Sequence, residues 1–127
     1  MSRIRDPRLH GLSHEHHHAL VLARRARLAE ERAGRAVADG SGGVDQAARW
    51  ASIQEEFKCS ILPHFVVEEE LMLPQLRARG EVEIVERTLR EHAELRELIA
   101  SEAPRLAAFG EALFAHVRFE ESVLFDR

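Results

Sequence analysis

The sequence predicts an all-α fold, an antiparallel up-down-up-down four-helix bundle with a metal site in its core. Composition is the first observation, because alanine, leucine, arginine and glutamate dominate the 127 residues, tyrosine is absent, and there are only 7 glycines and 4 prolines. The second is a His-x-x-x-Glu motif that occurs twice, at 64–68 and 116–120. Residues four apart share one face of a helix, so each motif can aim both side chains at one point. The length suits a single domain, residues 1–127, with one core.

The first helix is expected to begin at Leu12, with Ser13 as its N-cap, because a short hydroxyl side chain can accept a hydrogen bond from the first turn. Leucines and alanines recur on one face of this helix, which they share with His16. The glycine-rich stretch 34–44 is expected to form the only flexible loop.

A long second helix is expected from Asp45 to Arg79. Pro63 lies inside it and lacks a backbone N–H, so it should kink the helix just before His64. Pro74 should bend or interrupt the last turns, and Gly80 is a suitable terminator.

The third helix is predicted from Val82 to Ala100, with leucines near His92. Residues 101–104 should form a tight turn, because Pro104 suits the first turn of the fourth helix. The fourth helix then carries His116 and several apolar residues toward the C-terminus. Short connections between helices favour antiparallel neighbours in a bundle, which builds cofactor sites from side chains on facing helices.

The two His-x-x-x-Glu motifs belong to a longer internal repeat. Each is followed by a second glutamate and an apolar tail, and each is preceded by a Glu-His pair, at 15–16 and 91–92. Burying four imidazoles and two carboxylates would be unfavourable without a cation. The repeat therefore predicts a metal site, with two metal ions.

These blocks resemble the hemerythrin-like, or HHE cation-binding, family. The stretches 12–17, 64–74, 91–92 and 116–121 match the family's four blocks in order and span nearly the whole chain. The resemblance implies a four-helix bundle around a non-haem di-iron centre, with two iron ions as the cofactor. It also implies the metal ligands, with terminal histidines and bridging glutamates: His16, His64, His92 and His116 as terminal ligands, and Glu68 and Glu120 as bridges.

Two departures from the oxygen-carrying hemerythrins bear on function. Those proteins have a second histidine four residues after the one on the third helix, and this chain has Arg96 there. They also end with His-x-x-x-x-Asp, whereas here Glu120 follows His116 at four residues and Glu121 at five, which leaves both glutamates as candidate bridges. The predicted ligands would therefore be shared more symmetrically between the two irons than in the oxygen carriers, which argues against reversible oxygen carriage.

The first-helix ligand has two candidates. The Glu-His pair and the preceding leucine register favour His16, whereas the spacing of Leu20 from His17 matches that of Leu95 from His92. We prefer His16 because its helix face is more apolar.

Several other side chains have simpler interpretations. Five of the six phenylalanines are expected in the core, and the arginines of the first helix are expected on a solvated face. Three glutamates beside the motifs are expected in solvent. The alternative for these glutamates is that they orient the ligand histidines. Cys59 is expected to be small and buried. The five phenylalanines are Phe57, Phe65, Phe109, Phe114 and Phe119; the arginines are Arg24, Arg25, Arg27, Arg32 and Arg35; the glutamates are Glu69, Glu70 and Glu121.

Charge and composition exclude some partners and favour one location. The net charge is −4 and no basic stripe is present, so a nucleic-acid partner is not expected. No apolar run approaches the length needed to span a membrane. The single cysteine excludes a disulfide framework and favours the reducing cytoplasm.

The sequence leaves three classes of function. A di-iron protein that binds or senses dioxygen or a related small oxidant ranks first. The alternatives are a di-iron enzyme, acting on peroxide or nitric oxide or as a ferroxidase, and an interaction module in which the metal only stabilises the fold. Zinc or manganese could replace iron, since a mixed imidazole and carboxylate set does not select one metal. Catalysis, oligomeric state and protein partners are left open.

Overall fold

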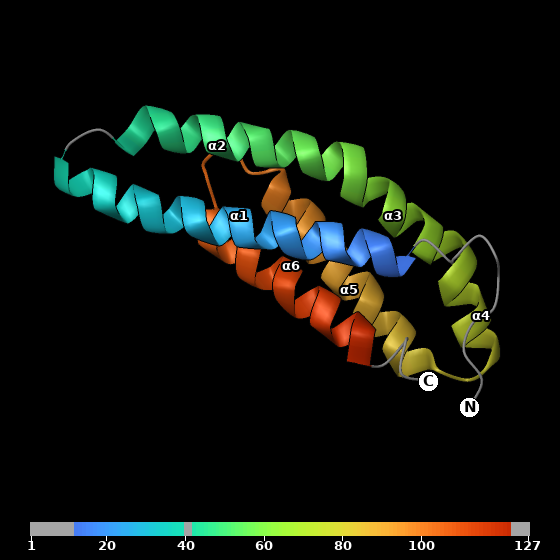
Figure 1. Cartoon of the computed structure of the whole chain (residues 1–127). Coiled ribbons are helices and arrows are strands. Elements are labelled where there is room, and N and C mark those ends of the chain that lie inside the picture. The colour runs from blue at the N-terminus through green and yellow to red at the C-terminus, as the bar shows by residue number, and fades with distance from the viewer. Residues whose placement is uncertain (1–11, 40–41, 123–127) are drawn as a thin grey trace.

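The computed structural model describes residues 12–39 and 42–122, and within these ranges every regular element is helical (Figure 1). These two ranges contain four helices, the second of which is interrupted twice by π-helical segments. The elements are α1 (Leu12–Asp39), α2 (Gly42–Glu56), η2 (Phe57–Ile61, π), α3 (Leu62–Val67), η3 (Glu68–Met72, π), α4 (Leu73–Ala78), α5 (Val82–Ile99) and α6 (Leu106–Glu120). The predicted all-α class is confirmed for this part of the chain.

The first connection is shorter than the predicted loop at 34–44. Helix α1 continues to Asp39 and α2 begins at Gly42, while residues 40 and 41 lie outside the described residues. An isolated glycine such as Gly34 lowers helix stability by only about 1 kcal/mol, which a helix of 28 residues tolerates. The side chain of Ser13, the expected N-cap, also lies outside the described part.

Each proline of the long second helix follows a π-helical segment. The N–H of Leu62 donates to the carbonyl of Phe57, and the N–H of Leu73 donates to the carbonyl of Glu68, both five residues back. The wider turn relieves the clash between a proline ring and the carbonyl four residues before it. The irregularities predicted at Pro63 and Pro74 therefore take this form.

Aromatic side chains form the centre of the core. Phe57 packs edge-on against both Phe65 and Phe109, with ring centroids 5.7 and 5.6 Å apart. Trp50 packs against Phe109 and donates its Nε1–H to the carbonyl of Ser101 at 3.0 Å, so it ties α2 to the connection between α5 and α6.

Two expectations about burial were wrong. Phe114 is 42% exposed, because it follows the buried Leu113 and faces away from the core, beneath the Arg27 guanidinium. Cys59 is also exposed and contacts Glu55, because buried Phe57 and Ile61 occupy the inner side of the π-helical segment around it. The other predicted core phenylalanines, Phe57, Phe65, Phe109 and Phe119, are buried. None of the helices described here is both long and apolar enough to cross a bilayer.

Gly110 permits close packing of α6 against α1. A Cβ atom at this position would lie 2.9 Å from Cγ of Arg27, 3.0 Å from the backbone oxygen of Ala23 and 3.3 Å from Cβ of Ala26. The backbone oxygen cannot move aside as a flexible side chain can. Small residues on α1 therefore face a glycine on α6, and this contact sets how near the two helices lie.

We expect Gly110→Leu to lower the free energy of unfolding by about 1–3 kcal/mol, because the added side chain overfills the contact with α1. The control is Ala107→Leu on the exposed side of α6, which should change stability by no more than about 0.5 kcal/mol. Urea denaturation at matched metal content measures both. Equal stability of the two variants would contradict the described packing of α1 on α6.

Candidate metal centre

The structure brings together all six side chains that the sequence singled out. Helix α1 supplies one histidine, α3 and the start of η3 a His-Glu pair, α5 one histidine, and α6 the second His-Glu pair. None of the six side chains is more than 4% exposed. They are His16, His64, Glu68, His92, His116 and Glu120.

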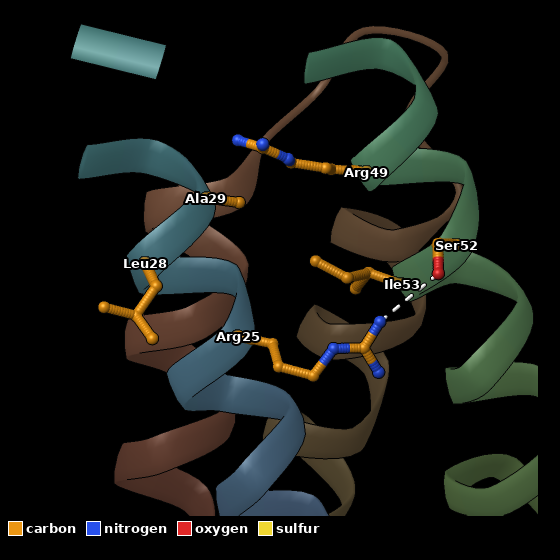
Figure 2. Close-up of a pocket in the computed structure, with 6 residues that line it drawn as sticks. All are labelled: Arg25, Leu28, Ala29, Arg49, Ser52 and Ile53. Carbon is orange, nitrogen blue, oxygen red and sulfur yellow. Dashed lines mark hydrogen bonds between the residues drawn. The ribbon is translucent and has the colours of Figure 1, made fainter. Parts of the chain in front are cut away.

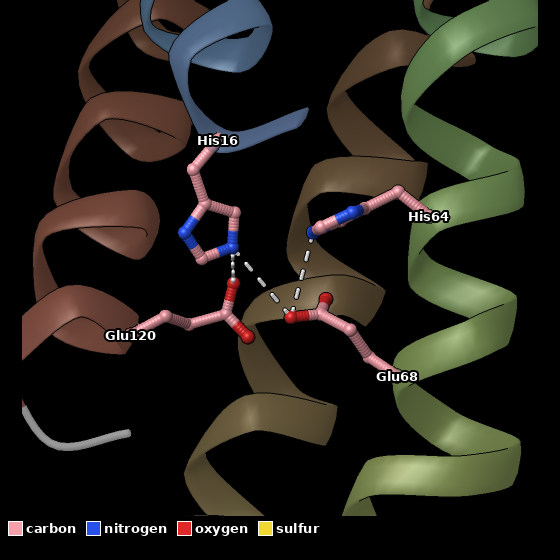
Figure 3. A group of neighbouring side chains, drawn as sticks. All are labelled: His16, His64, Glu68 and Glu120. Atoms are coloured by element: carbon pink, nitrogen blue, oxygen red, sulfur yellow. Dashed lines mark ion pairs between the residues drawn. The ribbon is translucent and has the colours of Figure 1, made fainter. Parts of the chain in front are cut away.

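Four of these side chains form one group of ligand-type atoms (Figure 3). Nε2 of His16 lies 3.2 Å from Oε1 of Glu120 and 3.8 Å from Oε2 of Glu68. Nε2 of His64 lies 3.5 Å from the same Oε2 of Glu68. All four side chains can therefore present an atom to one point.

The second group shares both carboxylates with the first. Nε2 of His92 lies 3.1 Å from Oε1 of Glu68, and Nε2 of His116 lies 3.0 Å from Oε1 of Glu120. Within each group the ligand-type atoms lie within 4.8 Å of one another. The arrangement is two adjacent sets of two imidazoles with two carboxylates common to both.

Several of these buried atoms have no hydrogen bond among the residues that the structure describes. They include both carboxylate oxygens of Glu68 and Glu120 and the Nε2 atoms of His92 and His116. Buried polar atoms are normally paired, since an unpaired one loses its hydration without compensation. Imidazole nitrogen and carboxylate oxygen are ligands for divalent transition metals. The residues present therefore fit a cation.

Burial and mutual contacts shift the pKa values of the cluster's side chains in different directions. Burial and the charge of Glu120 raise the pKa of Glu68 well above its usual range. For Glu120, burial acts in the same direction, but contacts with Glu68, His116 and His16 bring its pKa below the usual range. Burial disfavours the charged form of His116, yet its contacts with Glu120 and Glu91 raise its pKa to about 10. Burial and the neighbouring His116 lower the pKa of His92 to about 4.

The candidate ligands that the sequence left open differ in burial. His16 is buried in the cluster, whereas His17, the next residue on α1, is exposed. Glu120 is buried in the cluster, whereas Glu121 is partly exposed and lies 3.8 Å from Arg118.

Two glutamates near the cluster contact its histidines. Glu69 was expected in solvent, with a contact to a ligand histidine as the alternative, and the structure has the alternative, because its carboxylate lies 2.7 Å from Nδ1 of His92. Glu91 was noted only as part of the Glu-His repeat, and it contacts His116 rather than the histidine beside it. The repeat marked Glu91 as a residue of interest, but sequence spacing could not show its partner on another helix.

A surface pocket of about 290 Å³ between α1 and α2 includes none of the six side chains (Figure 2). Nη2 of Arg25 donates to Oγ of Ser52 across it at 3.2 Å, and the apolar side chain of Ile53 also lines the pocket. Arg24, Arg25 and Arg27 are exposed, which confirms a solvated face for these three. The side chains of Arg32 and Arg35 lie outside the described residues.

Comparison with known proteins identifies one related family. A family model described as the hemerythrin HHE cation binding domain matches residues 8–127. Neither the search of curated proteins nor the search of solved structures gave a match.

The two neighbouring histidines of α1 provide a direct test of the cluster. After anaerobic loading with ferrous iron and desalting, His16→Ala should lose metal from at least one position, because a buried imidazole is removed. His17→Ala should retain the wild-type metal content, since its side chain is exposed. Elemental analysis measures both. A larger loss in His17→Ala would move the α1 position from His16 to His17.

Proposed function

Because the chain belongs to the hemerythrin HHE cation-binding family, we propose that it is a non-haem di-iron protein that binds or senses oxygen or a related small oxidant. The observation that carries the proposal is the buried cluster of four imidazoles and two carboxylates, in which both carboxylates are common to two ligand groups. We further propose that residues 1–127 form one domain, an antiparallel up-down-up-down bundle with the metal site in its core. A chain with a single cysteine also suits the cytoplasm.

The two ligand groups suggest how the side chains would divide between two irons. His16 and His64 would hold one iron, His92 and His116 the other, and Glu68 and Glu120 would serve both. Each iron would then have two imidazoles and a share of two carboxylates, which leaves room for a small ligand. Zinc or manganese could occupy the same atoms, because affinity alone does not select iron.

When bound, a pair of irons supplies electrons to a small oxidant such as dioxygen. The protein contributes a dry and rigid surrounding. The ring of Phe65 stacks on His92, with centroids 3.8 Å apart and planes 9° from parallel, and packs edge-on against His116. Both contacts exclude water from that side of the cluster and restrict the rotation of the imidazoles.

The first test is the metal content of protein loaded with iron, together with its absorption spectrum before and after exposure to oxygen. We expect two irons per chain and near-ultraviolet bands that change on oxidation. Failure to retain iron after anaerobic reconstitution would refute the di-iron function. Consumption of peroxide or nitric oxide over many cycles would instead favour the enzyme alternative, and stable iron without any response to oxidants would favour the metal-stabilised interaction module.

The same measurement tests the shared carboxylates. Glu68→Ala and Glu120→Ala should each abolish loading with two metals, because each substitution removes an oxygen ligand from both groups. Glu70→Ala is the matched control, since Glu70 lies in the same π-helical segment as Glu68 but is exposed. Two metals per chain in either cluster variant would remove that glutamate as a bridge.

Loading should release protons. At pH 7 the metal-free protein holds a proton on His116, whose pKa is about 10, and the raised pKa of Glu68 favours a second. A bound proton must leave before either group can ligate a cation, so loading should release protons and apparent affinity should rise with pH. Titration of weakly buffered protein with zinc and a pH indicator measures the release. Loading without proton release would contradict this account of the cluster.

A further inference from the structure

A salt-bridged carboxylate lies behind His92, on the side away from the cluster. Oε2 of Glu69 lies 2.7 Å from Nδ1 of His92. Arg96 donates to both oxygens of the same carboxylate, from Nη1 at 2.8 Å and from Nη2 at 3.1 Å. The guanidinium of Arg96 also lies over the ring of Phe65, with Cζ 5.7 Å from its centroid. Arg96, Glu69 and His92 thus form a chain of contacts from the half-exposed arginine to the cluster.

The same arrangement occurs behind His116. Oε1 of Glu91 lies 2.7 Å from Nδ1 of His116, and Nε of Arg87 donates to Oε2 of Glu91 at 2.8 Å. The Arg87 guanidinium lies over the ring of Phe119, with Cζ 3.9 Å from its centroid. Two histidines of the same ligand group therefore each have a carboxylate on Nδ1, an arginine on that carboxylate and a phenylalanine beneath the arginine.

These contacts determine the tautomer of the two imidazoles. An ionised carboxylate can only accept hydrogen bonds, and the pairing of each carboxylate with an arginine favours its ionised form. Nδ1 of each histidine must then be the donor, so in the neutral ring Nε2 carries the free lone pair. Nε2 is the atom that faces the cluster, 3.1 Å from Glu68 in His92 and 3.0 Å from Glu120 in His116.

We propose that Glu69 and Glu91 are positioning residues that hold His92 and His116 as Nδ1–H tautomers with Nε2 directed at a metal ion. Arg96 and Arg87 fix the two carboxylates in place. The partners of metal-bound histidines orient the ring and increase its basicity as a ligand, and their loss typically weakens metal binding. This inference rests on the proposed metal-binding function and adds to it the residues that organise one of the two metal positions.

The test measures zinc affinity by competition with a chromophoric chelator. Glu69→Ala and Glu91→Ala should each weaken zinc binding at this position about 10–100-fold. Glu69→Gln and Glu91→Gln should lose less, because an amide oxygen can still accept the Nδ1–H bond. Glu94→Ala, an exposed glutamate on α5, is the control and should bind zinc like the wild type. The melting temperature of each metal-free variant shows whether a loss of affinity merely follows a loss of folding.

A second measurement reports the tautomer itself. Two-bond ¹H–¹⁵N correlation spectra of the zinc-loaded wild type should show His92 and His116 protonated at Nδ1 and metal-bound at Nε2. A purely structural ion pair would not require this tautomer. The substitution Arg96→Met leaves Glu69 in contact with His92, so it should weaken zinc binding less than Glu69→Ala does.

The possible failures are distinguishable. Wild-type protein that binds neither zinc nor iron would refute the proposed function, and this inference with it. Wild-type protein that binds metal, with unchanged affinity in the Glu69 and Glu91 variants or with Nε2 protonated in His92 and His116, would overturn this inference alone.

Discussion

The interaction on which the structure depends is the burial of two carboxylates among four imidazoles. Glu68 and Glu120 are both fully buried and contact histidines from the other helices. An uncompensated buried charge is unfavourable by several kcal/mol, whereas a cation between the groups would replace their mutual repulsion with attraction. The shifted pKa values of the cluster have the same origin, because protons provide the compensation when a cation does not. The core is thus organised around charge as well as around apolar packing.

Backbone features place these groups within reach of one another. Gly110 lets α6 lie close to α1, which brings the helix that carries His116 and Glu120 toward the helix that carries His16. The π-helical segment η2 comes just before the helical turn of His64, and η3 begins at Glu68 itself. Each π turn rotates the following residues relative to an unbroken α-helix, so η2 sets the direction in which the second helix presents His64 and Glu68, whereas η3 reorients the residues after them. π-helical turns are often found at functional sites for this reason.

The features that could be predicted from the sequence are those set by residues close together in one helix. The all-α class and the two His-x-x-x-Glu pairs were predictable, because helix composition and the spacing of four residues act within one helix. His16 and His92 came instead from the repeated Glu-His pairs and from the family resemblance. The loop at 34–44 was predicted too long, since glycine only weakens a long helix, and Cys59 was misplaced because the π turn changes which side of the helix faces the core. The histidine partners of Glu69 and Glu91 lie 23 and 25 residues away along the chain, on other helices. Such contacts depend on how the helices pack, which no local pattern encodes.

Arg96 connects the departure seen in the sequence with the geometry of the site. Arg96 stands where the oxygen-carrying hemerythrins have a second histidine, and here its side chain forms a two-bond ion pair with Glu69. The chain therefore has at this position a side chain that pairs with the carboxylate in contact with His92. Replacing Arg96 by histidine would add an imidazole and at the same time release the carboxylate that orients His92. One side chain cannot do both, so at this position the chain has an ion-pair partner for Glu69 in place of an imidazole.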